Sequence, residues 1–235
     1  MDFKKLLFYF SKFEWCLWLC SMLVITLSYI LSENFHILTL IASLVGVSAL
    51  IFLAKGNVIG QFLIIIFSIL YGIVSWEFRY FGELITYVFM SLPAAVVACV
   101  TWLKNPSKKG KSEVAIAPLT KTKLLLLLAL TLFVTILFYF ILAYFDTANL
   151  ILSTVSVATS FLAASLTILR SPYYALAYAA NDVVLIGLWI YASIAVISYL
   201  PMMFCFITFL VNDLYGFFSW RKMERRQFAN TADDL

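Results

Sequence analysis

Eight runs of predominantly apolar residues, each about 20 residues long, follow one another along this chain. A run of this length crosses the hydrocarbon core of a bilayer as an α-helix, because every backbone polar group in lipid must be satisfied within its own segment. The composition agrees, with 64% of the 235 residues hydrophobic and 12% charged, and no alternating pattern indicates a membrane barrel. We therefore predict an all-α polytopic membrane protein with eight transmembrane helices, at roughly 15–34, 36–54, 58–77, 82–103, 123–145, 148–169, 173–195 and 198–220.

The basic residues predict which side of the membrane each loop occupies. Fifteen of the sixteen Lys and Arg residues lie at the amino end, in alternate loops or in the carboxyl tail, and Arg79 alone lies in a loop on the other side. Cytoplasmic loops carry an excess of Lys and Arg. We therefore expect both termini and the polar linker 104–122 to be cytoplasmic. The net charge of +4 follows from this distribution, and it gives no indication of nucleic-acid binding.

The sequence contains no recognisable catalytic machinery. It has no Ser–His–Asp set, no pair of carboxylates suited to a water-filled cleft and no metal-type cluster. The four cysteines lie in apolar runs without metal-type spacing, so we expect small core residues rather than a disulfide framework. The sequence therefore predicts neither an enzyme nor a site for a cofactor or a metal ion.

Two stretches of the chain, 54–105 and 169–223, share an order of landmarks. Each opens with a basic residue and a turn former, carries a Trp near the far end of its first helix, and closes with Thr–Trp or Ser–Trp followed by a basic residue. One helix between two three-helix units makes both units enter the membrane in the same sense, an arrangement that transporters use. The predicted fold is thus 1 + (3+1+3), with two parallel repeats and a linker helix. The expected divisions are 1–35 (an additional amino-terminal helix), 36–103 (first repeat), 104–147 (linker and connecting helix), 148–223 (second repeat) and 224–235 (tail).

Polar side chains recur at helical spacing inside the predicted helices, where polar residues usually serve function. Asp182 and Asp213 stand out, because a carboxylate at membrane depth costs ~2.5–3.5 kcal/mol even on the lenient insertion scale. No Lys or Arg lies at depth in a predicted helix to pair with either acid. Each must therefore accept hydrogen bonds, be protonated or bind a ligand. The candidate substrate-binding residues are Asn57, Gln61, Tyr87, Tyr174, Tyr178, Asn181, Asp182, Trp189, Asn212 and Asp213.

Structural roles stay open for several of these residues. Buried amides and hydroxyls also join helices to one another in membranes. Asn57 is placed to cap the helix that begins at residue 58, and Trp189 lies where interfacial tryptophans form a belt. The chemistry of the whole set nevertheless indicates a kind of ligand. Carboxylates and amides suit hydroxyl groups and aromatic faces suit cations, so a sugar that carries a charged heterocycle fits better than a phosphorylated compound.

The chain resembles the PnuC transporters, bacterial inner-membrane proteins that take up vitamin B3 precursors, above all nicotinamide riboside. The stretches that carry the resemblance are AKGNVIGQFL, FSILYGIVSW, YFGELITY, RSPYYALAYAANDVVLIGLW and FLVNDLYGFFSWRK, and together they cover roughly residues 36–223. The resemblance implies a 3+1+3 fold similar to that of the SWEET sugar transporters, with facilitated diffusion of the substrate. It also implies a functional link to a cytosolic riboside kinase that traps the substrate by phosphorylation, and a homo-oligomer such as a trimer.

One departure from the family pattern bears on the substrate. Many members carry a Trp-x-x-Trp pair where this chain has Tyr174 and Tyr178, followed here by Asn181 and Asp182. We expect the tyrosines to pack against the nicotinamide ring, and the amide and the carboxylate to bind its carboxamide or the ribose hydroxyls. Another vitamin such as thiamine or riboflavin is the alternative substrate, since relatives that handle them share the fold. A small-solute channel is the alternative from a different class, although large aromatic residues at the site argue against it.

Overall fold

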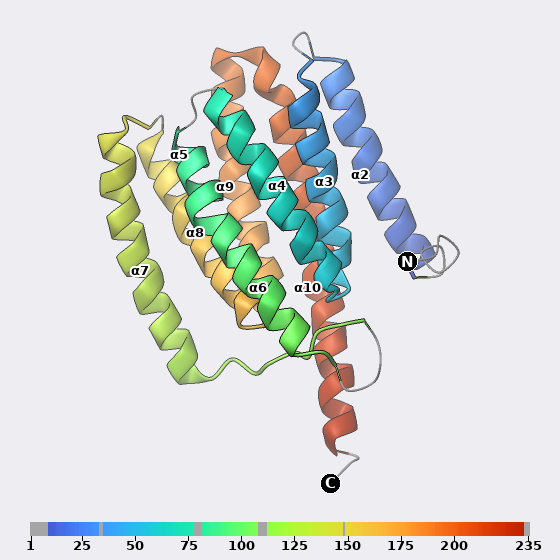
Figure 1. Cartoon of the computed structure of the whole chain (residues 1–235). Coiled ribbons are helices and arrows are strands. Elements are labelled where there is room, and N and C mark those ends of the chain that lie inside the picture. Colours follow the sequence, from blue (N-terminus) through green and yellow to red (C-terminus); the bar gives the residue numbers. More distant parts are fainter. Residues whose placement is uncertain (1–8, 33–34, 78–80, 108–111, 148, 233–235) are drawn as a thin grey trace.

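The computed structural model describes residues 9–32, 35–77, 81–107, 112–147 and 149–232 (Figure 1). It is helical almost throughout, and eight of its helices are long and apolar enough to cross a membrane, which confirms the predicted fold class. The elements are α2 (Lys12–Ile30), α3 (Ile37–Ala54), α4 (Val58–Glu77), α5 (Phe81–Ile85), the π-helix η1 (Thr86–Ser91), α6 (Leu92–Lys104), α7 (Lys121–Tyr144), α8 (Leu150–Ile168), α9 (Tyr173–Ala195), the short 3₁₀-helix η2 (Ile197–Tyr199) and α10 (Leu200–Ala232).

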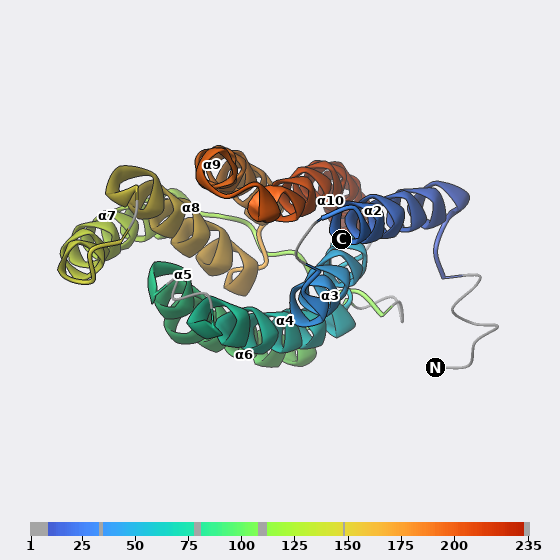
Figure 2. The same cartoon turned by 90° about the horizontal axis from the view of Figure 1, so that it is seen from above.

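Six helices surround the centre of the molecule. Seen from above in Figure 2, α3, α4 and α6 form one curved row and α8, α9 and α10 form the opposite row. Contacts between α6 and α8, and between α10 and α3, join the two rows at their ends and close the ring. Helix α2 packs outside α3 and α10, while α7 lies against α8 at the other edge. Whether the halves are two parallel repeats, as the landmarks suggest, stays a prediction.

The predicted helix 82–103 is not one continuous α-helix. It is divided into α5, the wide turns of η1, and α6, and the Leu92 backbone N–H donates to the Tyr87 carbonyl five residues earlier. The cause lies in Pro93, which has no N–H to give to the Phe89 carbonyl, so the regular four-residue bond cannot form there. Single π-turns of this kind are common at functional sites.

The last helix runs further than expected. Instead of ending near residue 220, α10 continues to Ala232, and Arg221 and Glu224 form an ion pair on its surface. Its extension is held by the linker, because Gln227 accepts a bond from Ile116 N at 2.8 Å and donates to Val114 O at 3.1 Å. The segment beyond 223 is therefore helical and is joined to the linker at Gln227.

One end of the bundle, which we call the linker end, carries the α3–α4 turn, the α8–α9 turn and the segment between α6 and α7 (bottom of Figure 1). Both turns contain a residue in the left-handed region, Gly56 at φ 64° and Arg170 at φ 57°. The α6–α7 segment bonds to both residues, from Val114 N to Gly56 O at 2.9 Å and from Ala117 N to Arg170 O at 3.2 Å. A single extended segment thus ties the two halves together.

Two buried tryptophans at the linker end each donate a hydrogen bond to a backbone carbonyl in the other half of the molecule. Trp102 Nε1 of α6 donates to the Thr167 carbonyl of α8 at 3.0 Å, and Trp220 Nε1 of α10 donates to the Leu53 carbonyl of α3 at 2.7 Å. Their ring centroids lie 5.3 Å apart. Each half of the molecule therefore supplies the indole that caps a first-helix carbonyl of the other half.

The predicted orientation rests in part on basic residues outside the described ranges. They are Lys4, Lys5, Arg79, Lys108, Lys109 and Lys111. The remaining basic residues of the chain that lie in the turns, the linker and the α10 extension gather at the linker end.

Candidate functional site

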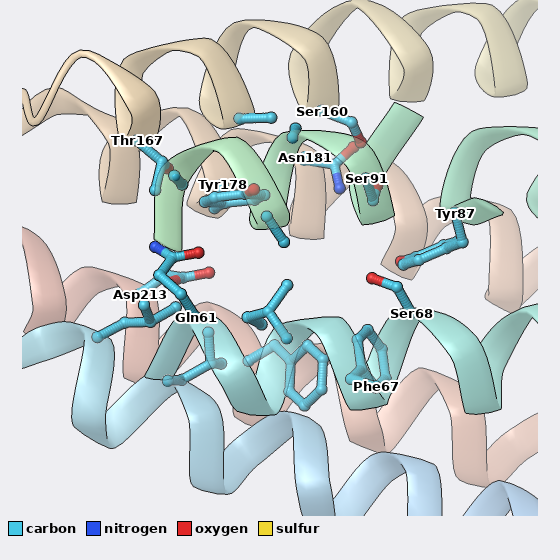
Figure 3. A pocket seen from close by; sticks show the side chains of 18 of the residues that line it. Gln61, Phe67, Ser68, Tyr87, Ser91, Ser160, Thr167, Tyr178, Asn181 and Asp213 are labelled. Carbon is cyan, nitrogen blue, oxygen red and sulfur yellow. The ribbon is translucent and has the colours of Figure 1, made fainter. Parts of the chain in front are cut away.

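A cavity lies inside the ring of six helices, and every one of these helices contributes to its wall. It leaves about 70 Å³ for the centres of water molecules, several times the ~10–15 Å³ that one water needs. Figure 3 shows side chains from facing helices pointing into it. The polar residues in its wall are Gln61, Ser68, Tyr87, Ser91, Ser160, Thr167, Tyr178, Asn181, Asp182 and Asp213.

Three polar atoms of the cavity wall have no hydrogen-bond partner within the described part of the protein. They are Gln61 Nε2, Ser68 Oγ and Asp182 Oδ2, and all three side chains are at least 97% buried. Buried polar groups are otherwise almost always bonded, because leaving one unsatisfied costs about 1–3 kcal/mol. One donor, one acceptor and one hydroxyl that can do either are thus held ready for a polar ligand.

Asn181 is oriented by the neighbouring helix. Its Oδ1 accepts hydrogen bonds from Ser156 Oγ at 3.1 Å and Thr159 Oγ1 at 2.8 Å, both on α8. With the oxygen fixed in this way, the Nδ2 amide group is left to face the cavity, as its position in Figure 3 indicates. Asn181 therefore offers hydrogen-bond donors beside the acceptor of Asp182.

Two acids face each other across the α9–α10 contact. Asp182 and Asp213 are 3% and 4% exposed, and their carboxyl groups interact with each other. Among the described residues of the cavity wall there is no Lys, Arg or His. Acidic groups in a medium of low dielectric, with no basic side chain beside them, favour a ligand that carries positive charge.

Aromatic rings make up much of the remaining wall. Phe67 meets Tyr87 edge-on at 5.7 Å and Phe209 at 5.9 Å, and Phe209 meets Phe206 at 5.6 Å. Behind them Tyr71 lies 4.4 Å from Tyr87, measured between ring centroids. Such rings offer flat apolar faces, and their electron-rich surfaces attract cations.

The structure brings six of the ten predicted site residues together in the cavity wall: Gln61, Tyr87, Tyr178, Asn181, Asp182 and Asp213. The other four, Asn57, Tyr174, Trp189 and Asn212, do not line it. Tyr174 lies directly behind the wall, edge-on to Tyr178 at 6.2 Å and to Trp220 at 4.7 Å. Trp189 packs near the opposite end of α9, 5.9 Å from Tyr199.

Asn212 serves the outer helix rather than the cavity. Its Nδ2 donates to Ser21 Oγ of α2 at 2.9 Å, and one turn further Tyr215 donates to Glu14 Oε1 of α2 at 2.8 Å. Asn212 and Tyr215 of α10 therefore face α2, whereas Asp213, about 100° further around the helix, faces the cavity.

Several cavity residues were not among the predicted ones. Ser160 and Thr167 belong to a polar series on α8, Ser153, Ser156, Ser160 and Thr167, whose three- to seven-residue spacing marks one helical face. That series was the available signal for α8. The phenylalanines of the wall gave no signal, because the chain has 22 phenylalanines and their sequence surroundings do not separate those in the cavity from those facing lipid.

Asn57 caps α4. Its Oδ1 accepts from Ile59 N at 2.9 Å and its Nδ2 donates to Tyr9 at 2.8 Å. We expect Asn57→Ala to lower the free energy of unfolding by about 0.5–2 kcal/mol, the usual cost of a lost cap. Melting temperature in detergent measures this, with Asn57→Asp as the control that keeps the cap. A melting temperature equal to that of the wild type would contradict the capping role.

Comparison with known proteins identifies the family. Residues 36–222 match the family model described as nicotinamide mononucleotide transporter. A nicotinamide riboside transporter PnuC of Neisseria mucosa is 26% identical over 190 residues, which cover 79% of this chain and 72% of that protein. The corresponding Haemophilus influenzae protein is 25% identical over 190 residues, or 80% of this chain and 81% of that one.

A solved structure shares the fold. The crystal structure of the vitamin B3 transporter PnuC superposes with a TM-score of 0.78 at 23% identity, over 93% of this chain and 94% of that one. The resemblance to the PnuC transporters is thus confirmed, and the family match extends over the whole ring of helices that encloses the cavity. The chain is a multi-pass membrane protein that belongs to the nicotinamide mononucleotide transporter family.

Proposed function

We propose that this protein carries nicotinamide riboside across a membrane, with the central cavity as its binding site. The names of the two relatives, both nicotinamide riboside transporters, support the substrate. The observation that carries the proposal is the set of unpartnered buried atoms in the cavity: Gln61 Nε2, Ser68 Oγ and Asp182 Oδ2. An apolar solute would leave them unsatisfied, whereas the hydroxyls and the carboxamide of a riboside supply both donors and acceptors.

The charge of the cavity favours the riboside over its phosphorylated form. The riboside has a cationic pyridinium ring, which suits the acids Asp182 and Asp213 and the aromatic faces of Phe67 and Tyr87. A phosphate group would lose its water without gaining a Lys or Arg in the described wall, and burial of an unpaired ion is costly. The family description names the mononucleotide, but this cavity fits the riboside, which carries no phosphate, better.

Calorimetry on the purified protein tests both points. We expect nicotinamide riboside to bind in the micromolar range or more tightly, and the mononucleotide at least tenfold more weakly, a difference of about 1.4 kcal/mol. Thiamine, which also carries a cationic ring, serves as the competing vitamin. Equal affinities for riboside and mononucleotide would contradict the argument from charge, and tighter binding of thiamine would assign the cavity to that vitamin.

The remaining parts of the proposal concern direction and partners. The basic residues at the linker end support a cytoplasmic location for that end and for both termini. We propose that transport is facilitated diffusion, since the cavity acids have no basic or histidine partner in the described wall with which to form a proton relay. Phosphorylation by a cytosolic riboside kinase would then retain the substrate, and assembly as a homo-oligomer, such as a trimer, is also part of this proposal.

A further inference from the structure

Gly46 lies in the middle of α3 and is buried, yet it does not line the cavity. A Cβ atom at this position would lie 2.5 Å from Cζ of Phe209 and 3.2 Å from two ring carbons of Phe67. Carbon atoms at rest lie about 3.5–4.0 Å apart. The absence of a side chain at Gly46 is therefore what allows both rings to pack flush against α3.

Backbone conformation does not account for this glycine. Among the glycines that the structure describes, Gly56 has a φ in the left-handed region, whereas Gly46 lies inside a regular helix. Glycine within a helix is less favourable than alanine, so the close approach of the two phenylalanines is the physical reason that remains.

Both rings form part of the cavity wall, and they have little freedom elsewhere. Phe209 and Phe67 are 7% and 6% exposed, their centroids lie 5.9 Å apart, and Phe206 lies 5.6 Å from Phe209 on another side. Packed interiors have few other voids. A methyl group added to α3 at residue 46 would therefore move the tip of the Phe209 ring toward the open space, which is the cavity.

We propose that Gly46 is a positioning residue that sets the width of the substrate cavity through Phe209 and Phe67. The part of this inference that concerns affinity rests on the proposed transport of nicotinamide riboside. The methyl group of Gly46→Ala would displace the Phe209 ring into the volume that the ligand needs, although residue 46 never touches the ligand.

The principal test compares two Gly→Ala exchanges. Gly46→Ala is expected to weaken riboside binding at least tenfold in calorimetry, with a melting temperature near that of the wild type. Gly187→Ala is the matched control, because a Cβ on Gly187 of α9 meets no atom within 4 Å, and it should leave the affinity unchanged. Wild-type affinity in Gly46→Ala would overturn the inference.

A second comparison shows whether the effect passes through Phe209. Phe209→Leu removes the ring atom that the new methyl group would approach most closely, so most of the effect of Gly46→Ala on affinity should be absent in that background. An equal loss in both backgrounds would overturn the inference. So would a Gly46→Ala protein that unfolds and is rescued by Phe209→Leu, because the ring would then have found no room in the cavity.

A ligand-free crystal structure of the Gly46→Ala protein separates this inference from the proposed function. The Phe209 ring should be displaced into the cavity, and an unmoved ring would overturn the inference whatever the substrate is. If the wild-type protein fails to bind riboside while the ring is displaced in the variant, the proposed function fails and the role of Gly46 in cavity width stands.

Discussion

Asp182→Asn is expected to weaken the binding of nicotinamide riboside by roughly ten- to a hundredfold. The exchange preserves the shape of the side chain but removes the charge and one acceptor, and a hydrogen bond to a charged group is worth ~1.5–3 kcal/mol. The fold should be unharmed or more stable, because Oδ2 of Asp182 has no partner in the described structure and a buried acid in a membrane helix is costly. Calorimetry and melting temperature on one detergent preparation measure the two effects.

Asn212→Ala is the matched control for this prediction. Asn212 adjoins Asp213 but donates to Ser21 of α2, so its loss should lower the melting temperature and leave the affinity for the riboside almost intact. Asn181→Ala should also weaken riboside binding, since its Nδ2 faces the cavity. Unchanged affinity in both the Asp182 and Asn181 variants would remove α9 from the binding site and shift attention to Gln61 and Ser68.

Trp220→Ala is expected to lower the free energy of unfolding by about 3–5 kcal/mol, the usual cost of truncating a buried Trp. The side chain is fully buried, its ring packs 5.3 Å from Trp102 and 4.7 Å from Tyr174, and its Nε1 donates to Leu53 O. Removal would open a void and take away one of the hydrogen bonds that the Leu53 carbonyl accepts, leaving the one from Gly56 N at 2.8 Å. Denaturant-induced unfolding in mixed detergent micelles measures the change.

Two further variants divide this effect into its parts. Trp220→Phe keeps most of the ring contacts and loses the hydrogen bond, so a loss of about 1 kcal/mol is expected. Trp76→Ala is the exposed control, since Trp76 is 65% exposed and its exchange should change stability by about 0.5 kcal/mol at most. A Trp220→Ala protein as stable as the Trp76→Ala protein would refute the closing role of Trp220.

The helices could be predicted from the sequence because lipid imposes a simple rule on them. A long apolar segment has no choice but to be helical in a bilayer, and the eight predicted spans correspond to the eight observed ones. Departures arose where one residue changes a local bond. Pro93 produces the π-helix η1, and Gln227 and its linker contacts accompany the extension of α10 beyond the predicted end.

Site residues could be predicted from the sequence where their type is costly in a membrane. They could not be predicted where only the three-dimensional packing determines whether a side chain faces the cavity. Asp182 and Asp213 were identified because an acid at depth demands a reason. Asn212 and Asp213 are neighbours in sequence, and only the packing of α2 against α10 assigns the first to a helix contact and the second to the cavity. The helical spacing of polar residues shows that they share one face of a helix, but it does not show which other helix packs against that face.

The hydrogen bonds of the two tryptophans across the halves also bear on the order in which the chain can fold during its synthesis. Leu53 and Trp220 are separated by 167 residues, so at ordinary rates of translation α3 leaves the ribosome ~10–30 s before its partner is made. Throughout that interval the Leu53 carbonyl can keep its local hydrogen bond from Gly56 N, but the place of the indole has to be taken by water, lipid or another protein. The first-made half thus waits in the bilayer in an unfinished state, and synthesis of the last helix completes its packing.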